Sequence, residues 1–389
     1  MVSWSMENRV NYIDNLRWIT VSLLVLYHTA MAYNTWGEAN YIFFEEVKPI
    51  ASIVTFISPW FMPQMFLLAG VASSYSLKKR GCGAFLRERL VRLGIPLVVG
   101  ILVLTPILSY VADVTNNGYS EGLFKHYGIF FTRFTDLTGY DGGFTMAHLW
   151  FLAVLILISA LSVGILRIGR TGKCHGNNVI ECESGKNERN QNGSWTKTKV
   201  ILGVLLSVLS IATFDVRFGG KPLILYLCVY LLGYYIFSDL EFVDRMSRFK
   251  WIFVLVFLAV SIADVALFIY VKGYETLNTI CNYAAFATAI PALISLGHDR
   301  LDFRNRISVF NAKISYTFYI LHFPVVVLLQ YAFWLMNMNS ITGFLLTVVI
   351  AYPLTFGLCC VVDVMKRSVK KSNLKKNVGN ESNQDNQED

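Results

Sequence analysis

The sequence contains few charged residues for a chain of its length. Asp, Glu, Lys and Arg make up 15% of its 389 residues, whereas they make up about a quarter of an ordinary soluble domain. Hydrophobic residues account for 54%, and they are grouped in long runs. This composition excludes an ordinary soluble domain and indicates an integral membrane protein.

Cysteine is too scarce and too scattered for a disulfide framework. The seven cysteines fall in apolar runs (Cys228, Cys281, Cys359 and Cys360) and in loops that we expect in the cytosol (Cys82, Cys174 and Cys182). We therefore expect reduced thiols. A metal site at Cys174, His175 and Cys182 would lack a fourth ligand, so we predict no metal.

The apolar runs define the predicted fold. They lie at about 17–36, 51–77, 90–112, 148–166, 200–214, 221–238, 251–270, 278–297, 311–333 and 341–365. The run at 200–214 is short, and small residues at 69–74 in the second run indicate close helix packing. We therefore predict an all-α, polytopic membrane protein with about ten transmembrane helices and both termini on one side.

The net charge of +8 would suit a nucleic-acid partner, but the positions of the basic residues argue for a membrane instead. On the ten-helix topology, 28 of the 34 Lys and Arg residues fall on the side of the two termini. The cytosolic loops of membrane proteins carry such an excess. We therefore place both termini in the cytosol, in a multi-pass protein of the cell (plasma) membrane, and expect no nucleic-acid partner.

Composition also divides the chain. Residues 1–366 form the predicted transmembrane domain. Within it, 113–147 is expected to be a long outer connection without helix that could cap a site, and 167–199 a polar cytosolic linker. Residues 367–389 are predicted to form a disordered cytosolic tail.

The stretch from Arg9 to Tyr33 contains the strongest functional signal. Arg17 and His28 are eleven residues apart, so on a helix they lie within about 20° of each other and roughly 16 Å apart. Such groups are costly inside a bilayer, roughly 2.5–3.5 kcal/mol for an Arg, so we interpret this face as the core of a catalytic site, with Asp14 as a partner of Arg17.

Ala30-Met31-Ala32 has the form of a signal-peptidase site, but the long polar segment before the run and the residues that continue the helix favour an uncleaved span.

Arg89 and Arg92 are spaced i, i+3 near the start of the third run, so they share a helix face. Paired guanidinium groups suit phosphate, because their forked donors match its oxygens. Anchoring by the positive-inside rule, or pairing with anionic lipid headgroups, would produce the same pattern. The spacing alone does not decide between these interpretations.

Other polar residues interrupt the later runs. His148 begins the fourth run beside aromatic residues, a pattern more often found in an interfacial anchor than in a catalyst. Asp264 is a lone acid in the seventh run, and the sequence does not identify its partner.

The ninth run contains SYTFYILHFP at 315–324. Pro324 has no N–H group, so it frees the carbonyl one turn back, near Ile320. Ser315, Tyr319 and His322 lie on adjacent rows of one helix face. His322 is either a second histidine of the site or a hydrogen-bonded helix contact.

Together these stretches resemble the membrane acyltransferase-3 family, which includes bacterial O-acetyltransferases of surface polysaccharides and the glucan-modifying protein C group. The resemblance covers about residues 8–365. It rests on Arg17 and His28 within YIDNLRWITVSLLVLYH, on Phe61–Gly70, on the Arg89-Leu-Val-Arg92 pair before Gly-Ile-Pro, on HLWFL at 148–152 and on SYTFYILHFP at 315–324. We expect no extracytoplasmic esterase-like domain of the kind that many members carry.

The resemblance implies roles for particular residues. His28 matches the family's proposed catalytic histidine and Arg17 the basic residue paired with it, while Arg89 and Arg92 match an arginine pair associated with acyl-CoA. The two remaining motifs supply candidate substrate-binding residues, namely His148, Trp150, Tyr316 and His322.

We therefore predict an acyltransferase that moves an acyl group, expected to be acetyl, from cytosolic acyl-CoA to a hydroxyl of a carbohydrate or cell-surface glycan. A neutral imidazole can take the hydroxyl proton, or form an acyl-imidazole. A transporter with Arg17, His28 and Asp264 as a relay is the alternative. The acceptor, the choice between acetyl and succinyl, the partner that orients His28 and the oligomeric state stay open.

Overall fold

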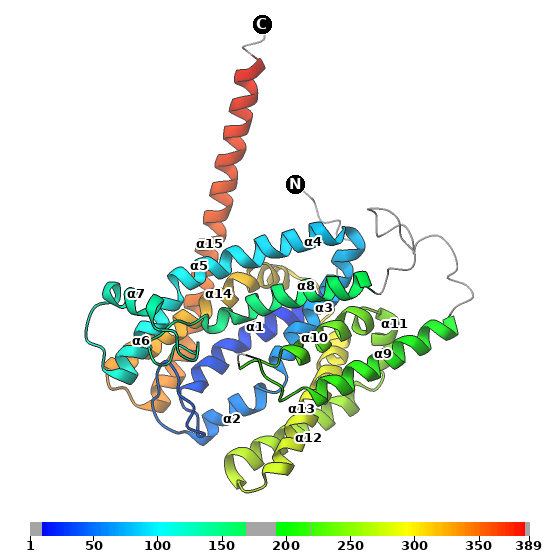
Figure 1. Ribbon diagram of the computed structural model, residues 1–389, viewed down its shortest axis with the longest axis horizontal. Coiled ribbons are helices and arrows are strands. Elements are labelled where there is room, and N and C mark those ends of the chain that lie inside the picture. Colours follow the sequence, from blue (N-terminus) through cyan, green and yellow to red (C-terminus); the bar gives the residue numbers. More distant parts are fainter. Residues whose placement is uncertain (1–9, 169–191, 219, 386–389) are drawn as a thin grey trace.

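The computed structural model describes residues 10–168, 192–218 and 220–385, and it is built from helices (Figure 1). Seven of the helices in these ranges are long and apolar enough to cross a membrane, or eight if one bent pair counts as a span. They are Lys48–Lys79, Cys82–Asn117, Ala147–Arg167, Lys250–Val271, Glu275–Arg300, Arg306–Leu335 and Ser340–Ser368, with Leu223–Phe237 and Leu240–Ser247 as the bent pair. The all-α, polytopic architecture agrees with the sequence.

Two of the ten predicted runs form helices that are shorter or less apolar than these. The first is α1 (Asn11–Met31), which carries polar and charged groups at Asp14, Arg17 and His28. The other contains Lys199–Ala212, an apolar helix of fewer than 18 residues. The number of spans, ten, therefore stays a prediction.

Helix α1 lies in the middle of the bundle (Figure 1). It packs against α2 (Lys48–Ile57), α3 (Phe61–Lys79), α13 (Glu275–Arg300), α14 (Arg306–Leu335) and α15 (Ser340–Asp385). Its buried residues include Tyr12, Leu16 and Val25. This position explains how a helix with charged side chains can lie inside the protein, because its polar face meets other helices and not lipid.

Helices α3 and α10 (Leu223–Leu232) approach each other very closely. A Cβ atom at Gly70 would lie 2.0 Å from the carbonyl oxygen of Tyr230, and one at Gly233, directly after α10, would lie 2.2 Å from that of Leu67. Only glycine fits at both positions. The predicted close packing of the second run is confirmed, because small residues let two helix backbones meet.

The third run belongs to a longer helical segment than expected. Helix α4 (Cys82–Arg89) continues through a π-helical turn, η2 (Leu90–Gly94), into α5 (Ile95–Val103) and α6 (Thr105–Asn117). The expected outer connection then contains a helix of its own, α7 (Leu123–Thr132), where we had expected none.

The fourth run is η3 (Ala147–Leu149) followed by α8 (Trp150–Ile168), and the fifth belongs to α9 (Asn192–Ala212). The predicted linker at 167–199 lies largely outside the described residues, as do Cys174, His175 and Cys182. After α10, the chain passes through η4 (Gly233–Phe237) and turns by 92° into α11 (Leu240–Ser247).

The last third of the chain contains the longest helices. Helix α12 (Lys250–Val265) continues as the π-helical η5 (Ala266–Val271) and pairs with α13. Helix α14 pairs with α15, which extends away from the bundle as helix to Asp385 (Figure 1). The sequence predicts a disordered tail from 367, whereas the structure continues the helix to Asp385. A helix that is already formed gains one hydrogen bond for each residue it adds, so extension is easier than nucleation.

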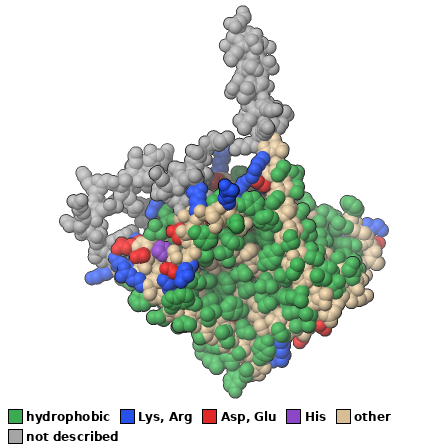
Figure 2. All heavy atoms as spheres, turned by 180° about the vertical axis from the view of Figure 1, so that it is seen from behind, with side chains coloured by type: hydrophobic (Ala, Val, Ile, Leu, Met, Phe, Trp, Pro, Cys, Tyr) green, Lys and Arg blue, Asp and Glu red, His purple; other side chains and the backbone are tan. Residues whose placement is uncertain are grey.

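Hydrophobic side chains cover most of the face shown in Figure 2, while Lys and Arg side chains gather along its upper rim near the base of α15. Many apolar residues of the described chain are well exposed, such as Leu255 at 65% and Val349 at 66%. Exposed apolar surface on this scale marks contact with lipid or partners, and here it agrees with a protein embedded in a bilayer.

Candidate functional site

Helix α1 presents Arg17 near its start and His28 near its end. Arg17 donates a hydrogen bond to Asp14 through Nη1, at 2.9 Å. The predicted pairing of Asp14 with Arg17 is therefore confirmed. The carboxylate is only three residues from the arginine, so the pair forms within one helical turn.

Three histidines that are far apart in the sequence meet beside α1. The ring centroid of His322, on α14, lies 5.4 Å from that of His28 and 5.3 Å from that of His148. Phe323 forms a shared wall, with its ring 4.2 Å from His28 and 5.2 Å from His148. The structure thus brings together the predicted catalytic histidine and two of the predicted substrate-binding residues.

His148 is held by the carbonyl that Pro324 frees. Its Nε2 lies 2.9 Å from the carbonyl oxygen of Ile320. In a regular helix that oxygen would accept from the N–H of residue 324, which is proline here. A carbonyl only accepts, so Nε2 of a neutral His148 must carry the hydrogen, and Nδ1 must present a lone pair. The hydroxyl of Tyr319 also donates to the His148 carbonyl.

His322 is fixed in the opposite tautomer. Its Nδ1 lies 2.7 Å from the carbonyl oxygen of Tyr319 and 3.2 Å from that of Phe318. By the same reasoning Nδ1 carries the hydrogen and Nε2 presents a lone pair. Nδ1 of His148 and Nε2 of His322 are both buried without a hydrogen-bond partner among the described residues. The two buried lone pairs therefore belong to neighbouring rings, whose centroids are 5.3 Å apart.

His28 makes no side-chain hydrogen bond within the described part of the chain, and its side chain is partly exposed while His322 is fully buried. Its ring packs against Phe323 on one side and meets the edge of Tyr27. The imidazole is therefore held by ring contacts, and its nitrogens stay available to a substrate. This is the condition for a general base.

The arginine pair lies at the other end of the same face. Nη2 of Arg89 donates to Oγ of Ser73 on α3, at 2.5 Å, and its guanidinium interacts electrostatically with those of Arg17, Arg80 and Arg92. Arg17 and Arg80 are each paired with a carboxylate, that of Asp14 and that of Glu88, so Arg89 and Arg92 are the stronger candidates for binding an anion. The structure therefore places Arg17 within electrostatic reach of Arg89, whereas the resemblance pairs Arg17 with His28.

The other two predicted substrate-binding residues lie away from the histidines. Tyr316 donates its hydroxyl to the backbone carbonyl of Arg92, at 2.9 Å, so it belongs to the arginine end. Trp150 stacks on Tyr226 of α10, and the ammonium of Lys221 lies 4.5 Å from its ring centroid. Trp150 thus packs α8 against α10.

Asp264 has partners that the sequence did not identify. Its carboxylate accepts hydrogen bonds from Asn278 at 2.8 Å and from Asn282 at 3.1 Å, both on α13. The acid is buried, and two amides satisfy it. It therefore joins α12 to α13, and this geometry gives no support to a relay through Arg17, His28 and Asp264.

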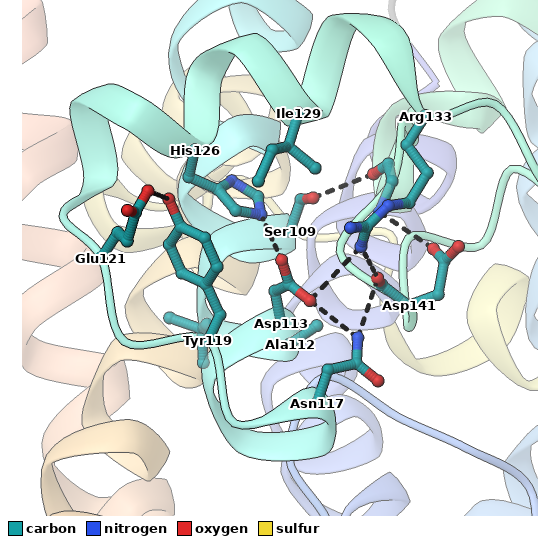
Figure 3. Close-up of polar contacts among 12 residues, drawn as sticks. Ser109, Ala112, Asp113, Asn117, Tyr119, Glu121, His126, Ile129, Arg133 and Asp141 are labelled. Carbon is teal, nitrogen blue, oxygen red and sulfur yellow. Dashed lines mark hydrogen bonds and ion pairs between the residues drawn. The ribbon is translucent and has the colours of Figure 1, made fainter.

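A buried polar cluster closes the opposite end of the bundle, and the sequence analysis missed it. Nε2 of His126 on α7 lies 3.2 Å from Oδ2 of Asp113 on α6, and Arg133 lies 3.3 Å from the other oxygen. Figure 3 shows these side chains converging on Asp113 together with Asn117. The loop after α7 joins this cluster through Asp141, whose backbone oxygen accepts from Arg133. The cluster ties α7 and its loop to α6 as a cap.

Burial acts against charge on His126. It lowers the pKa of His126 below its usual value, an effect larger than the opposing one of the Asp113 carboxylate. Gly142 keeps the loop close to this pair, since a Cβ there would lie 2.4 Å from Cγ of Asp113. The signal that could have identified the cluster is a histidine among the aromatic and glycine residues of 113–147.

Within the described residues, no group of three or more His, Cys, Asp or Glu side chains has an arrangement that could hold a metal ion.

The fold and the site together define a helical membrane protein with imidazoles in its interior and clustered guanidinium groups at one end. A family model described as an acyltransferase domain, that of acyltransferase 3, matches residues 10–364. The chain belongs to the acyltransferase 3 family, and it is an acyltransferase. Neither a curated protein nor a solved structure matches it.

Proposed function

We propose that this enzyme transfers an acyl group, most simply acetyl, from cytosolic acyl-CoA to a hydroxyl of a carbohydrate or cell-surface glycan. The proposal rests on two clusters of side chains along α1. The start of α1 lies near Arg89 and the other arginines, and His28 near the end of α1 lies beside His322, which in turn lies beside His148. A donor with phosphates at one end and a thioester at the other suits such an arrangement.

His28 acts as the base in this proposal. The acceptor oxygen attacks the thioester carbonyl carbon and forms a C–O bond, while the C–S bond breaks. The hydroxyl proton passes to His28 and then to the departing CoA sulfur. Transient acylation of the His28 ring is the alternative route, and it would leave a mass increment on the protein.

The donor enters from the cytosol in this proposal. Arg89, Arg92 and Arg17 hold its phosphates, and the thioester arm extends along α1 toward His28, which is roughly 16 Å from Arg17 by helix geometry. The rim of basic side chains in Figure 2 supports cytosolic termini, and we propose the cell membrane as the location.

The test uses the purified full-length chain with radiolabelled acetyl-CoA and a mixture of gluco-oligosaccharides. The wild type should move label from CoA to the sugar, and His28→Ala should reduce the rate at least about 100-fold, because a general base contributes that much. His298→Ala is the matched control, since His298 contacts Tyr12 and Ser247 at a different place, and it should retain the rate. Transfer that persists in a folded His28→Ala protein would refute the role of His28.

A further inference from the structure

An open groove lies at the start of α14, and none of its lining residues belongs to the site described above. Its volume is about 590 Å³, and it is lined by Arg304, Asn305, Arg306, Val309, Phe310 and Lys313. This volume is within the range of about 300–1,000 Å³ that is usual for ligand sites. Three of the lining residues are cations and none is an acid, so the groove suits an anionic ligand.

The lining residues from α14 form one stripe along that helix. Arg306, Val309, Phe310 and Lys313 follow one another at i, i+3, i+4 and i+7, a spacing that places them on one face. The stripe therefore carries a cation at each end and two apolar side chains between them. A ligand that fits it must be anionic in one part and apolar in another.

A carboxylate on α15 reaches this stripe, and two cations share it. Asp363 pairs with Lys313 at 2.6 Å and with Arg367 at 2.5 Å. Its single negative charge therefore does not neutralise both of them, and Arg306 adds a further positive charge at the other end of the stripe. The groove keeps an excess of positive charge that an anion can neutralise.

Apolar surface continues from the groove along α14 and α15. Ile307 is 70% exposed. The ring centroid of Phe310 lies 5.4 Å from that of Phe356 on α15, and Phe356 is also exposed. Phe356 lies inside the candidate membrane span Ser340–Ser368. Figure 2 shows the same order at the base of α15, where Lys and Arg side chains border the hydrophobic face.

We infer that the groove binds the headgroup of an anionic phospholipid. Arg306 and Lys313 donate hydrogen bonds to the phosphate oxygens, and an acyl chain lies along Phe310 and Phe356 toward the centre of the bilayer. A basic pocket at the end of membrane helices suits such a headgroup. A zwitterionic lipid fits less well, because these cations repel its ammonium group. The bound lipid is neither donor nor acceptor in the proposed reaction, so this inference does not depend on that reaction.

The test measures which lipid the full-length protein retains. The protein in detergent is incubated with equal amounts of phosphatidylglycerol and phosphatidylcholine that carry the same acyl chains, and it is then separated from free lipid. Mass spectrometry quantifies the bound lipid, and the wild type should retain an excess of phosphatidylglycerol. Arg306→Gln/Lys313→Gln should lower that excess roughly 25-fold, since each cation at a membrane surface changes the affinity for anionic lipid roughly 5-fold.

Two control variants separate the groove from the general positive charge of the protein. Arg245→Gln/Arg248→Gln removes the same charge from α11, where both arginines pair with acids of the same helix, and it should retain the excess. Arg306→Lys/Lys313→Arg keeps the charge in the groove and should also retain it. An equal loss in the α11 variant would make the excess a property of net charge and would overturn the groove as a site.

Soluble anions identify the occupant. Inorganic phosphate, CoA and glycerophosphoglycerol, which is the same headgroup without acyl chains, are each added in excess over the lipid. None should displace phosphatidylglycerol from the wild type, because none supplies an acyl chain for the apolar part of the site. Displacement by phosphate or glycerophosphoglycerol would indicate a site for phosphate alone, and displacement by CoA would assign the groove to the acyl donor. Either result would overturn the lipid as the occupant.

A wild type that retains the two lipids equally overturns the inference, and so does a folded Arg306→Gln/Lys313→Gln protein that keeps the full excess. If that double variant does not fold, the single variants decide, each with an expected loss of roughly 5-fold. An unchanged excess in both single variants would overturn the site.

Discussion

Nε2 of His148 bonds the carbonyl oxygen of Ile320 at 2.9 Å, and this contact depends on the proline four residues beyond Ile320. Proline at 324 removes the N–H that would otherwise occupy that oxygen. A residue that weakens α14 thus supplies an acceptor to a histidine on another segment. The same proline therefore weakens α14 and positions His148.

Pro324→Ala should separate these two effects. The new N–H should bond the Ile320 carbonyl and compete with His148, so the unfolding temperature should rise while kcat/KM for a hydroxyl acceptor falls about 5-fold. The expected fall corresponds to about 1 kcal/mol, a typical net hydrogen bond. Thermal unfolding in detergent and acetyl-CoA turnover measure the two quantities.

Pro291→Ala is the matched control, because Pro291 lies inside α13. It should raise the unfolding temperature without changing the turnover. If Pro324→Ala raised stability and left acceptor kinetics unchanged, the Ile320 carbonyl would have no part in positioning His148.

The sequence predicted contacts between residues that are close in the chain, but for contacts between helices it identified at most one of the two partners. The Asp14–Arg17 pair and the freed Ile320 carbonyl follow from residues three or four positions apart, where helix geometry is known in advance. The partner of the carbonyl is 172 residues away in sequence, and that of Arg89 is on another helix. Such pairs depend on how helices pack, which hydropathy does not specify.

The same limit applies to the fold. Each candidate membrane span in the described residues contains a predicted apolar run, because a bilayer requires long stretches without charge. The apolar runs did not predict α7 or the Asp113–His126 contact. Those features lie in a segment of mixed composition, where the polar groups are buried against each other and not against lipid.

Close contact between α3 and α10 predicts a strong effect at Gly70. Gly70→Ala would place a methyl group 2.0 Å from the Tyr230 carbonyl oxygen, so the two helices must separate. Overpacking typically costs about 1–3 kcal/mol, and we expect a clear fall in the unfolding temperature. Gly164→Ala, on α8 with nothing within 4 Å of the added carbon, should leave stability unchanged or raise it by up to about 1 kcal/mol.

The hydrogen bond from Arg89 to Ser73 predicts a donor-specific defect. Ser73→Ala leaves the guanidinium without its orienting acceptor, so the KM for acetyl-CoA should rise about 10-fold, or about 1.4 kcal/mol, within the range for hydrogen bonds to charged groups. The KM for the acceptor should stay the same. Ser74→Ala, one residue along α3, serves as the control. A rise in the acceptor KM and not in that of acetyl-CoA would contradict the assignment of Arg89 to the donor.

The cap predicts that stability depends on pH through His126. Burial lowers the pKa of His126 in the folded protein, so the unfolded chain binds more protons as the pH falls below about 6.5, the usual value for histidine. Stability should therefore be complete above about pH 6.5 and decrease toward the lower pKa of the folded state, by at most about 1.4 kcal/mol per pH unit. Partial burial raises the pKa of Asp141, but hydrogen bonds from Thr135 and from backbone N–H groups, together with the charge of Arg133, outweigh it and lower the pKa, so that group titrates below this range. Unfolding temperatures between pH 8 and pH 5 test the effect, and a His126→Gln protein should lose less stability than the wild type over that interval. An equal loss in both proteins would assign the pH dependence to other groups.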